Sequence, residues 1–254
     1  MTTLVTHLVD GSTPDLRDAA VVELRQYTLR PGRRDELVAV FEDSLLDPQV
    51  VDGMTVGGLF RDLDDSDRFV WQRGFPDMES RRRSLSAFYG GDTWRAHGAA
   101  ANATMLDSDD VLLLRSTSPP HPVGRSEDQG HDGVVAVGIV SCRPIATAES
   151  LLTGPGHEVL LAGLDAEVAT WRTDPSPNTF PALPVREDHV FVWQATFANE
   201  VSLNAALARL DAAGEWRALA ARVPGWAERR LRLLPTRRSR HPRPRIEAQP
   251  VSGG

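Results

Sequence analysis

The sequence contains no lysine, since all 28 basic residues among its 254 are arginine. Lysine is the side chain that forms Schiff bases with carbonyl substrates and with pyridoxal phosphate, so this chemistry is excluded. Cys142 is the single cysteine, which excludes an intrachain disulfide and a cluster of thiolate metal ligands. We interpret this use of cysteine as typical of a reducing, cytoplasmic compartment.

Long hydrophobic runs are also missing. No stretch approaches the roughly 20 apolar residues that a membrane-spanning helix needs. Residues 1–18 have neither a basic start nor a long apolar core, so they do not predict a signal peptide. The net charge of −7 gives no overall basic field that would attract nucleic acid or anionic lipid. We therefore expect neither a nucleic-acid partner nor a membrane partner.

Motifs for common cofactors and catalytic devices are absent as well. The chain has no GxGxxG dinucleotide fingerprint, no phosphate-binding P-loop and no GxSxG elbow. Its seven histidines are scattered, without a metal-ligand spacing such as HxH or HExxH. Asp107, Asp109 and Asp110 lack the glycine and the closing glutamate of a calcium loop. We predict no cofactor and no metal.

What the sequence does contain is an internal repeat. FVWQRGF at 69–75 returns as FVWQATF at 191–197, which is 122 positions later. The Trp-Arg pair at 94–95 recurs at 216–217 with the same offset. A constant offset of this kind indicates a duplication. We therefore expect two similar units in one chain.

Hydrophobic periodicity and turn residues predict the elements of the first unit, residues 21–115. In chain order we expect a strand at 21–29, a helix at 33–47, strands at 53–62 and 68–75, a helix at 77–90 that resumes after a glycine break, and a strand at 110–115. This β-α-β-β-α-β order is that of a ferredoxin-like unit.

The second unit, residues 134–235, follows with weaker signals. We expect a strand at 134–142, a helix at 155–172, strands near 179–183 and at 189–197, a helix at 199–222 and a strand at 228–235. The composition of the remaining segments predicts a flexible arm at 1–20, a linker at 116–133 and a disordered Arg- and Pro-rich tail at 236–254.

Two ferredoxin-like units predict an α+β barrel. Each unit covers one face of its sheet with helices and leaves the other face open, and two open faces can bury each other. We expect a monomer that closes the barrel within the chain, or a homodimer. The cavity between the two sheets would then be the ligand site.

Strand parity selects the residues that face this cavity. Val22 and Leu24 share one face of the first strand, and the charged residues lie on the other. The apolar pair is expected to meet the helices, which directs the polar face into the barrel. The residues expected to line the cavity by this argument are Glu23, Arg25, Tyr27, Trp71 and Arg73.

The two copies differ at these positions. The offset is 113 for the first strand and 122 further along the chain. The counterparts of Glu23, Arg25, Tyr27, Arg73 and His97 are Ala136, Gly138, Val140, Ala195 and Leu219. A cavity with one polar wall and one apolar wall suits a largely apolar ligand with one anionic or carbonyl end.

The segments VELRQYTLRPGRRDEL, FVWQRGFPDMESRRRSLSAFYGGDTW and ANATMLDSDDVLLLR resemble the NIPSNAP family of the dimeric α+β barrel superfamily, most of all its actinobacterial members. The resemblance covers 21–115 well and 134–235 weakly. It implies the barrel fold. It implies no single chemistry, because the superfamily includes cofactor-free monooxygenases, polyketide cyclases, haem-using dehydratases and small-molecule binders, and it assigns no catalytic residue here.

A catalytic set is predicted from the residues themselves. We expect Arg25 and Arg73 to polarise a substrate oxygen. Glu23 or His97 would then move a proton. Each role has a plainer alternative: Glu23 and the arginines can form a structural ion pair, and His97 can be a packing residue on an outer helix.

Aromatic side chains are expected to bind the substrate. Tyr27 would donate a hydrogen bond, Trp71 would form a wall, and Tyr89 would line the cavity mouth. Trp94 lies three positions before His97, on the same helix face. The alternatives are aromatics that fill the barrel or end a helix.

The leading hypothesis is a cofactor-independent enzyme of specialised metabolism. It would carry out a cyclisation, an isomerisation or another proton transfer on a largely apolar carbonyl or carboxylate compound. The first alternative is a non-catalytic small-molecule binding or scaffold protein. The second is a cofactor-free monooxygenase.

Overall fold

A computed structural model of the protein describes residues 16–117, 129–130, 133–142 and 153–242. The first unit has the predicted β-α-β-β-α-β order. Its elements are β1 (Val21–Leu29), α1 (Arg34–Val40), α2 (Leu46–Val51), β2 (Thr55–Asp62), β3 (Arg68–Phe75), α3 (Met78–Gly90), α4 (Asp92–Thr104) and β4 (Met105–Ser116). A π-helical turn, Phe41–Leu45, joins α1 to α2.

The second unit follows the same order. Its elements are β6 (Val134–Ser141), α6 (Pro155–Leu164), β7 (Val168–Thr173), β8 (Val190–Phe197), α7 (Glu200–Ala212), α8 (Gly214–Arg222) and β9 (Ala227–Pro235). The helix expected at 155–172 is wrong in its second half, because Asp165 adopts a left-handed φ of 51° that ends α6. The strand expected near 179–183 is wrong as well, since these residues belong to an irregular segment between β7 and β8.

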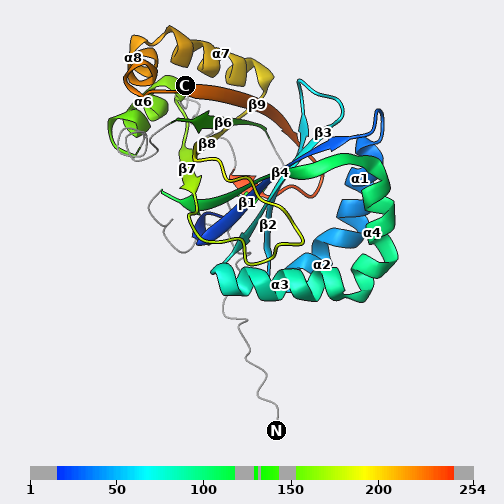
Figure 1. Cartoon of the computed structure of the whole chain (residues 1–254). Helices are drawn as coiled ribbons and strands as arrows, with labels where there is room; N and C mark the ends of the chain where they lie inside the picture. Colours follow the sequence, from blue (N-terminus) through cyan, green and yellow to red (C-terminus); the bar gives the residue numbers. More distant parts are fainter. Residues whose placement is uncertain (1–15, 118–128, 131–132, 143–152, 243–254) are drawn as a thin grey trace, which may run out of the picture.

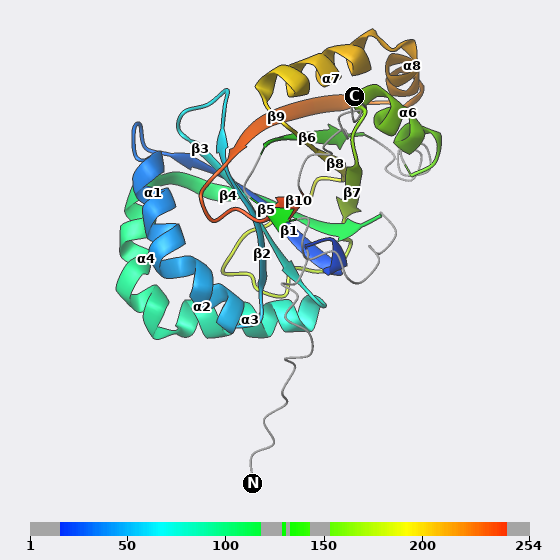
Figure 2. The same cartoon turned by 180° about the vertical axis from the view of Figure 1, so that it is seen from behind.

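The eight long strands close one antiparallel barrel within the chain, in the order β1-β3-β2-β9-β6-β8-β7-β4. Two seams join the units, β2 with β9 and β4 with β7. Helices α1–α4 cover the outside of the first unit and α6–α8 that of the second (Figures 1 and 2). The predicted α+β barrel is therefore confirmed, and its closure needs no second chain.

Strand register reproduces both sequence offsets. Glu23 of β1 lies opposite Arg73 of β3, and Ala136 of β6 lies opposite Ala195 of β8. The two pairs are related by the offsets of 113 and 122. Equivalent positions of the two units can therefore be compared residue by residue.

Apolar side chains from both units fill the barrel interior. They include Val22, Leu24, Phe60, Val137, Trp171 and Leu233. One polar pair lies among them, in which Gln72 Nε2 donates to Gln194 Oε1 at 2.9 Å. These glutamines are the last residues of the two FVWQ copies, so the two copies of the motif are in contact inside the barrel.

The predicted assignment of strand faces is therefore wrong. Val22 and Leu24 face the interior, whereas Glu23, Arg25 and Tyr27 face the helices outside. Almost every residue of β1 is buried, because the barrel covers one face and the helices cover the other. Alternation identifies the two faces of such a strand, but it does not tell which one meets the helices.

Residues near both ends of the described chain pack on the barrel, contrary to the predicted arm and tail. Leu16 and Ala19 join the interior cluster. Ser239 and His241 are buried, and Ser239 Oγ accepts a hydrogen bond from Leu59 N at 2.9 Å. A short ladder pairs β10 (His241–Pro242) with β5 (Gln129–Gly130). The parts of the predicted arm, linker and tail outside the described residues are 1–15, 118–128, 131–132 and 243–254.

None of the helices within the described residues combines the length and the apolar character that crossing a bilayer requires.

Candidate functional site

A buried cluster of charged side chains lies between the first sheet and its helices. The Glu23 carboxylate is at the centre and accepts hydrogen bonds from three guanidinium groups. Arg25 Nη1 and Arg73 Nε donate to Oε2 at 2.8 and 2.7 Å, and Arg81 Nε donates to Oε1 at 2.7 Å. All four residues are at most 2% exposed.

The local structure explains why these four side chains meet. Glu23 and Arg25 are two positions apart on β1 and share a face. Arg73 is the cross-strand neighbour of Glu23 on β3. Arg81 lies on the buried face of α3, one turn before Leu85.

The cluster has an excess of two positive charges. Within the described residues, Arg25, Arg73 and Arg81 each form an ion pair with Glu23 and with no other carboxylate. Removing charge from water without full compensation is costly. An anion placed beside this cluster would therefore be favoured.

The other guanidinium hydrogen bonds extend the cluster along β1, to α2 and to the second unit. Arg25 Nε donates to Tyr27 Oη at 2.8 Å. Arg73 Nη1 donates to Oε1 of Gln49, on α2, at 3.2 Å. Arg81 Nη1 donates to Asn178 Oδ1 at 2.9 Å. Asn178 belongs to the second unit, so both units contribute to the site.

Three buried donors of the site have no hydrogen-bond partner among the described residues. They are Nη2 of Arg73, Nη2 of Arg81 and Nε1 of Trp71. The Arg73 guanidinium carbon lies 5.1 Å from the ring centre of Trp71. Buried polar groups normally have a partner. This group of free donors therefore suits a ligand that carries acceptor oxygens.

The environment sets the protonation states of Glu23 and Tyr27. Burial alone would raise the pKa of Glu23, but the charges of Arg73, Arg25 and Arg81 outweigh it and hold this pKa far below its ordinary value. Burial raises the pKa of Tyr27. Glu23 is therefore a weak base, and Tyr27 remains a hydrogen-bond donor.

Arg25 remains a cation. Burial would lower its pKa, but the contacts with Tyr27 and Glu23 raise it above the ordinary value. Arg25 therefore keeps its positive charge at neutral pH.

An aromatic pocket adjoins the cluster, with about 30 Å³ of free space. This volume holds roughly two water molecules. The aromatic residues that line it are Tyr27, Phe41, Trp71, Phe88, Tyr89 and Trp94. Tyr27, Gln49 and Trp71 both line the pocket and contact the arginines. The charges therefore lie directly behind an aromatic wall.

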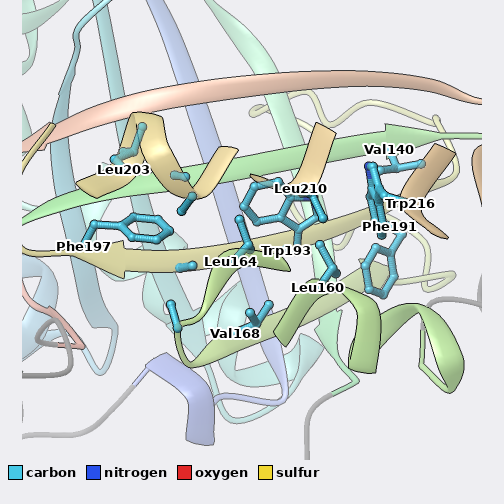
Figure 3. Packing of buried hydrophobic residues seen from close by; sticks show 14 of the residues in the cluster. Val140, Leu160, Leu164, Val168, Phe191, Trp193, Phe197, Leu203, Leu210 and Trp216 are labelled. Atoms are coloured by element: carbon cyan, nitrogen blue, oxygen red, sulfur yellow. The ribbon is translucent and has the colours of Figure 1, made fainter. Parts of the chain in front are cut away.

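The second unit has no charged cluster at the equivalent positions. The counterparts of Glu23, Arg25, Arg73 and Arg81 are Ala136, Gly138, Ala195 and Leu203. The Trp193 ring fills the space beside Gly138. Figure 3 shows Trp193 among Leu160, Leu164 and Leu210, which are buried apolar side chains of the same cluster.

Comparison with known families places this site within a recognised domain type. Residues 22–119 match the NIPSNAP family model. The match covers the first unit from its second residue onwards, including all four residues of the charged cluster. No curated protein matches the chain.

Solved structures match both units together. A Lactobacillus acidophilus protein described as a candidate monooxygenase aligns with a TM-score of 0.54 at 10% identity, over 88% of this chain and 99% of that one. A candidate monooxygenase from Fusobacterium nucleatum gives 0.54 at 10% identity, over 92% and 99%. An anthrone oxidase-like protein gives 0.53 at 15% identity, over 95% and 98%. At these identities the likeness establishes the fold alone.

Most of the predicted site residues lie together in the NIPSNAP-matching unit, although outside the barrel. Glu23, Arg25 and Arg73 form the cluster, and the predicted binding residues Tyr27, Trp71, Tyr89 and Trp94 line the pocket. His97 is exposed on α4 and does not join them. No group of three or more His, Cys, Asp or Glu side chains in the described part of the chain could hold a metal ion.

Sequence reasoning missed Arg81, Gln49 and Asn178. Arg81 had two signals: it shares a helix face with Leu85 and Phe88, and the offset of 122 pairs it with Leu203. Asn178 had none, because it reaches the site from an irregular segment of the other unit.

We predict that Gly138→Ala destabilises the protein, because a Cβ at this position would overlap the Trp193 ring. The free energy of unfolding should fall by about 1–3 kcal/mol. Gly214→Ala is the matched control, since nothing lies within 4 Å of a Cβ there. Urea denaturation measures both variants, and equal midpoints for the two would contradict the close contact.

Glu23→Gln removes the negative charge at the centre of the cluster and leaves three cations facing one another. We expect the free energy of unfolding at pH 7 to fall by about 3–5 kcal/mol. Glu79→Gln, at an exposed carboxylate of α3, should leave it nearly unchanged. Denaturant titration of the two variants checks this difference.

The effect of Glu23→Gln should also depend on pH. The pKa of Glu23 is lowered in the folded protein relative to an unfolded value of about 4.3. Its contribution is therefore complete above that value and is lost as the pH falls towards the folded pKa. The stability gap between wild type and variant should be constant above about pH 5 and shrink below about pH 4. A gap that does not change over this range would rule out an ionised Glu23.

Proposed function

We propose that the protein is a cofactor-independent enzyme acting on a small, largely apolar carbonyl or carboxylate compound. The observation that carries this proposal is the buried cluster of three guanidinium groups around one carboxylate, behind an aromatic pocket. The excess positive charge favours an oxyanion, and the aromatic walls favour an apolar body. The reaction site is the helix side of the first unit rather than the barrel interior.

Tyr27 is the residue best placed to contact a substrate oxygen. Its oxygen accepts the hydrogen bond from Arg25, so the phenol proton is left to donate to another acceptor. The guanidinium group makes this proton a better donor. Developing negative charge on a carbonyl oxygen would be stabilised by this donor and by the field of the arginines.

The cluster is suited to stabilising an anion and poorly suited to removing a proton. Glu23 is held ionised by three arginines and is a weak base. The substrates that fit are therefore compounds with an acidic C–H or O–H group, such as enols, phenols and 1,3-dicarbonyl compounds. Their enolates are the intermediates of isomerisations and cyclisations next to a carbonyl group.

A second candidate is a cofactor-free oxygenase reaction. An enolate or phenolate stabilised in this way can supply electrons to dioxygen. A substrate CH₂ then becomes C=O, and the second oxygen atom leaves with the two hydrogens as water. The proteins of similar fold include candidate monooxygenases and an anthrone oxidase-like protein. Oxygen consumption by the protein with an anthrone would favour this reaction, whereas turnover without oxygen would favour isomerisation or cyclisation.

We predict that the pocket prefers an anionic ligand over a neutral one of the same shape. Calorimetry should give 1-naphthoate an affinity at least about tenfold above that of 1-naphthalenemethanol. Arg73→Met should remove most of this preference, since it reduces the charge behind Trp71. Arg82→Met, at an exposed position of α3, should retain it.

Equal binding of the two probes by the wild type would contradict an anion site. Binding of 1-naphthoate without turnover of any acidic carbonyl compound, with or without oxygen, would favour the non-catalytic alternative. Thermal melting of the Arg73→Met variant confirms that a lost preference is not a lost fold.

A further inference from the structure

The segment between β7 and β8, residues 174–189, crosses from the second unit to the pocket of the first. It is the irregular yellow trace near β1 and α3 in Figure 1. Both ends are fixed to β4: Asp174 N donates to Leu113 O, and Arg186 N donates to Val111 O, each at 2.8 Å. The central residues 178–183, here termed the cover segment, lie against α3.

Asn178 connects the cover segment to the charged cluster. Its Oδ1 accepts from Arg81 Nη1 at 2.9 Å and from Phe180 N at 3.0 Å. Its Nδ2 donates to Leu183 O at 2.9 Å. A single amide therefore fixes the fold of the cover segment and the orientation of the Arg81 guanidinium group.

Phe180 connects the cover segment to the pocket. Its ring is stacked on Tyr89, with the ring centres 5.9 Å apart and the planes at 27°. Tyr89 lines the pocket and contacts Trp94 edge to face at 4.7 Å. The position of Phe180 therefore limits how far Tyr89 can move outwards.

The pocket is small, so the contact between Phe180 and Tyr89 affects which ligands can enter. About 30 Å³ does not admit a ring-sized molecule unless a wall side chain moves. Tyr89 and Trp94 are only half-buried, whereas Trp71 and Phe41 are buried. The wall that can yield is thus the one that Phe180 supports.

We propose that the cover segment of the second unit selects the substrate of the first unit's pocket. Phe180 determines through Tyr89 the size of the apolar body that enters. Asn178 is a positioning residue, which holds Arg81 in the charged cluster behind the pocket, where its charge favours the anionic end of the ligand. This inference rests on the proposed function and adds a specificity determinant to it. The second unit, which has no charged cluster, thereby determines which ligands bind to the first unit, which has one.

Two probes of different size test the proposal, benzoate and 1-naphthoate, with dissociation constants from calorimetry. Phe180→Ala should shift the affinity ratio towards 1-naphthoate by about fivefold or more, and Phe180→Leu by less. Asn178→Ala should weaken both probes by about tenfold. Because this amide also fixes the fold of the cover segment that carries Phe180, the variant should shift the ratio as well, but by less than Phe180→Ala does. Glu187→Ala, at an exposed position of the β7–β8 connection outside the cover segment, should change neither quantity.

The outcomes separate this inference from the proposed function. If Arg73→Met removes the preference for the anion while Phe180→Ala and Asn178→Ala bind like the wild type, the cover segment has no selecting role and the pocket stands. If the wild type binds neither probe, the proposed function fails and the selecting role fails with it. Circular dichroism and melting temperatures verify the fold, and Phe180→Leu retains an apolar side chain should Phe180→Ala unfold.

Discussion

The contact between one carboxylate and three guanidinium groups organises the first unit. Glu23 binds Arg25 on its own strand, Arg73 on the neighbouring strand and Arg81 on α3. The same arginines then reach α2, through Gln49, and the second unit, through Asn178. The buried ion pairs and hydrogen bonds of this cluster therefore fix the positions of the sheet, the helices and the cover segment relative to one another. Because desolvating these charges is costly, their net contribution to stability is smaller than the loss expected when one partner is removed.

Part of this arrangement was predictable from the sequence and part was not. The offset of 122 predicts the two units, and it agrees with the register of β3 and β8. Alternation on β1 correctly groups Glu23 with Arg25 and Tyr27. It does not reveal that this group faces the helices, because that depends on what covers each face. One clue was available in Gln72, a polar residue on the face of β3 opposite to that of Arg73. Its side chain lies inside the barrel, where it forms a hydrogen bond with Gln194.

Contacts between distant segments account for the remaining errors. Arg81 belongs to a run of three arginines, and only helical phase separates it from its two exposed neighbours. Asn178 and Phe180 lie among prolines in a stretch without periodicity, so local pattern carries no information about their partners. The exposed position of His97 follows from the phase of α4. Sequence patterns of this kind predict elements and faces, whereas the pairing of side chains from different elements requires the folded chain.

The closure of the barrel within one chain has a genetic consequence. In a barrel built from two identical subunits, every substitution occurs in both subunits, so a substitution that abolishes one site abolishes both. Here Ala136 and Ala195 occupy in one unit the positions that Glu23 and Arg73 occupy in the other. The two units can therefore acquire different roles by independent substitutions, and a change such as one at Phe180 is selected for its effect on a single pocket.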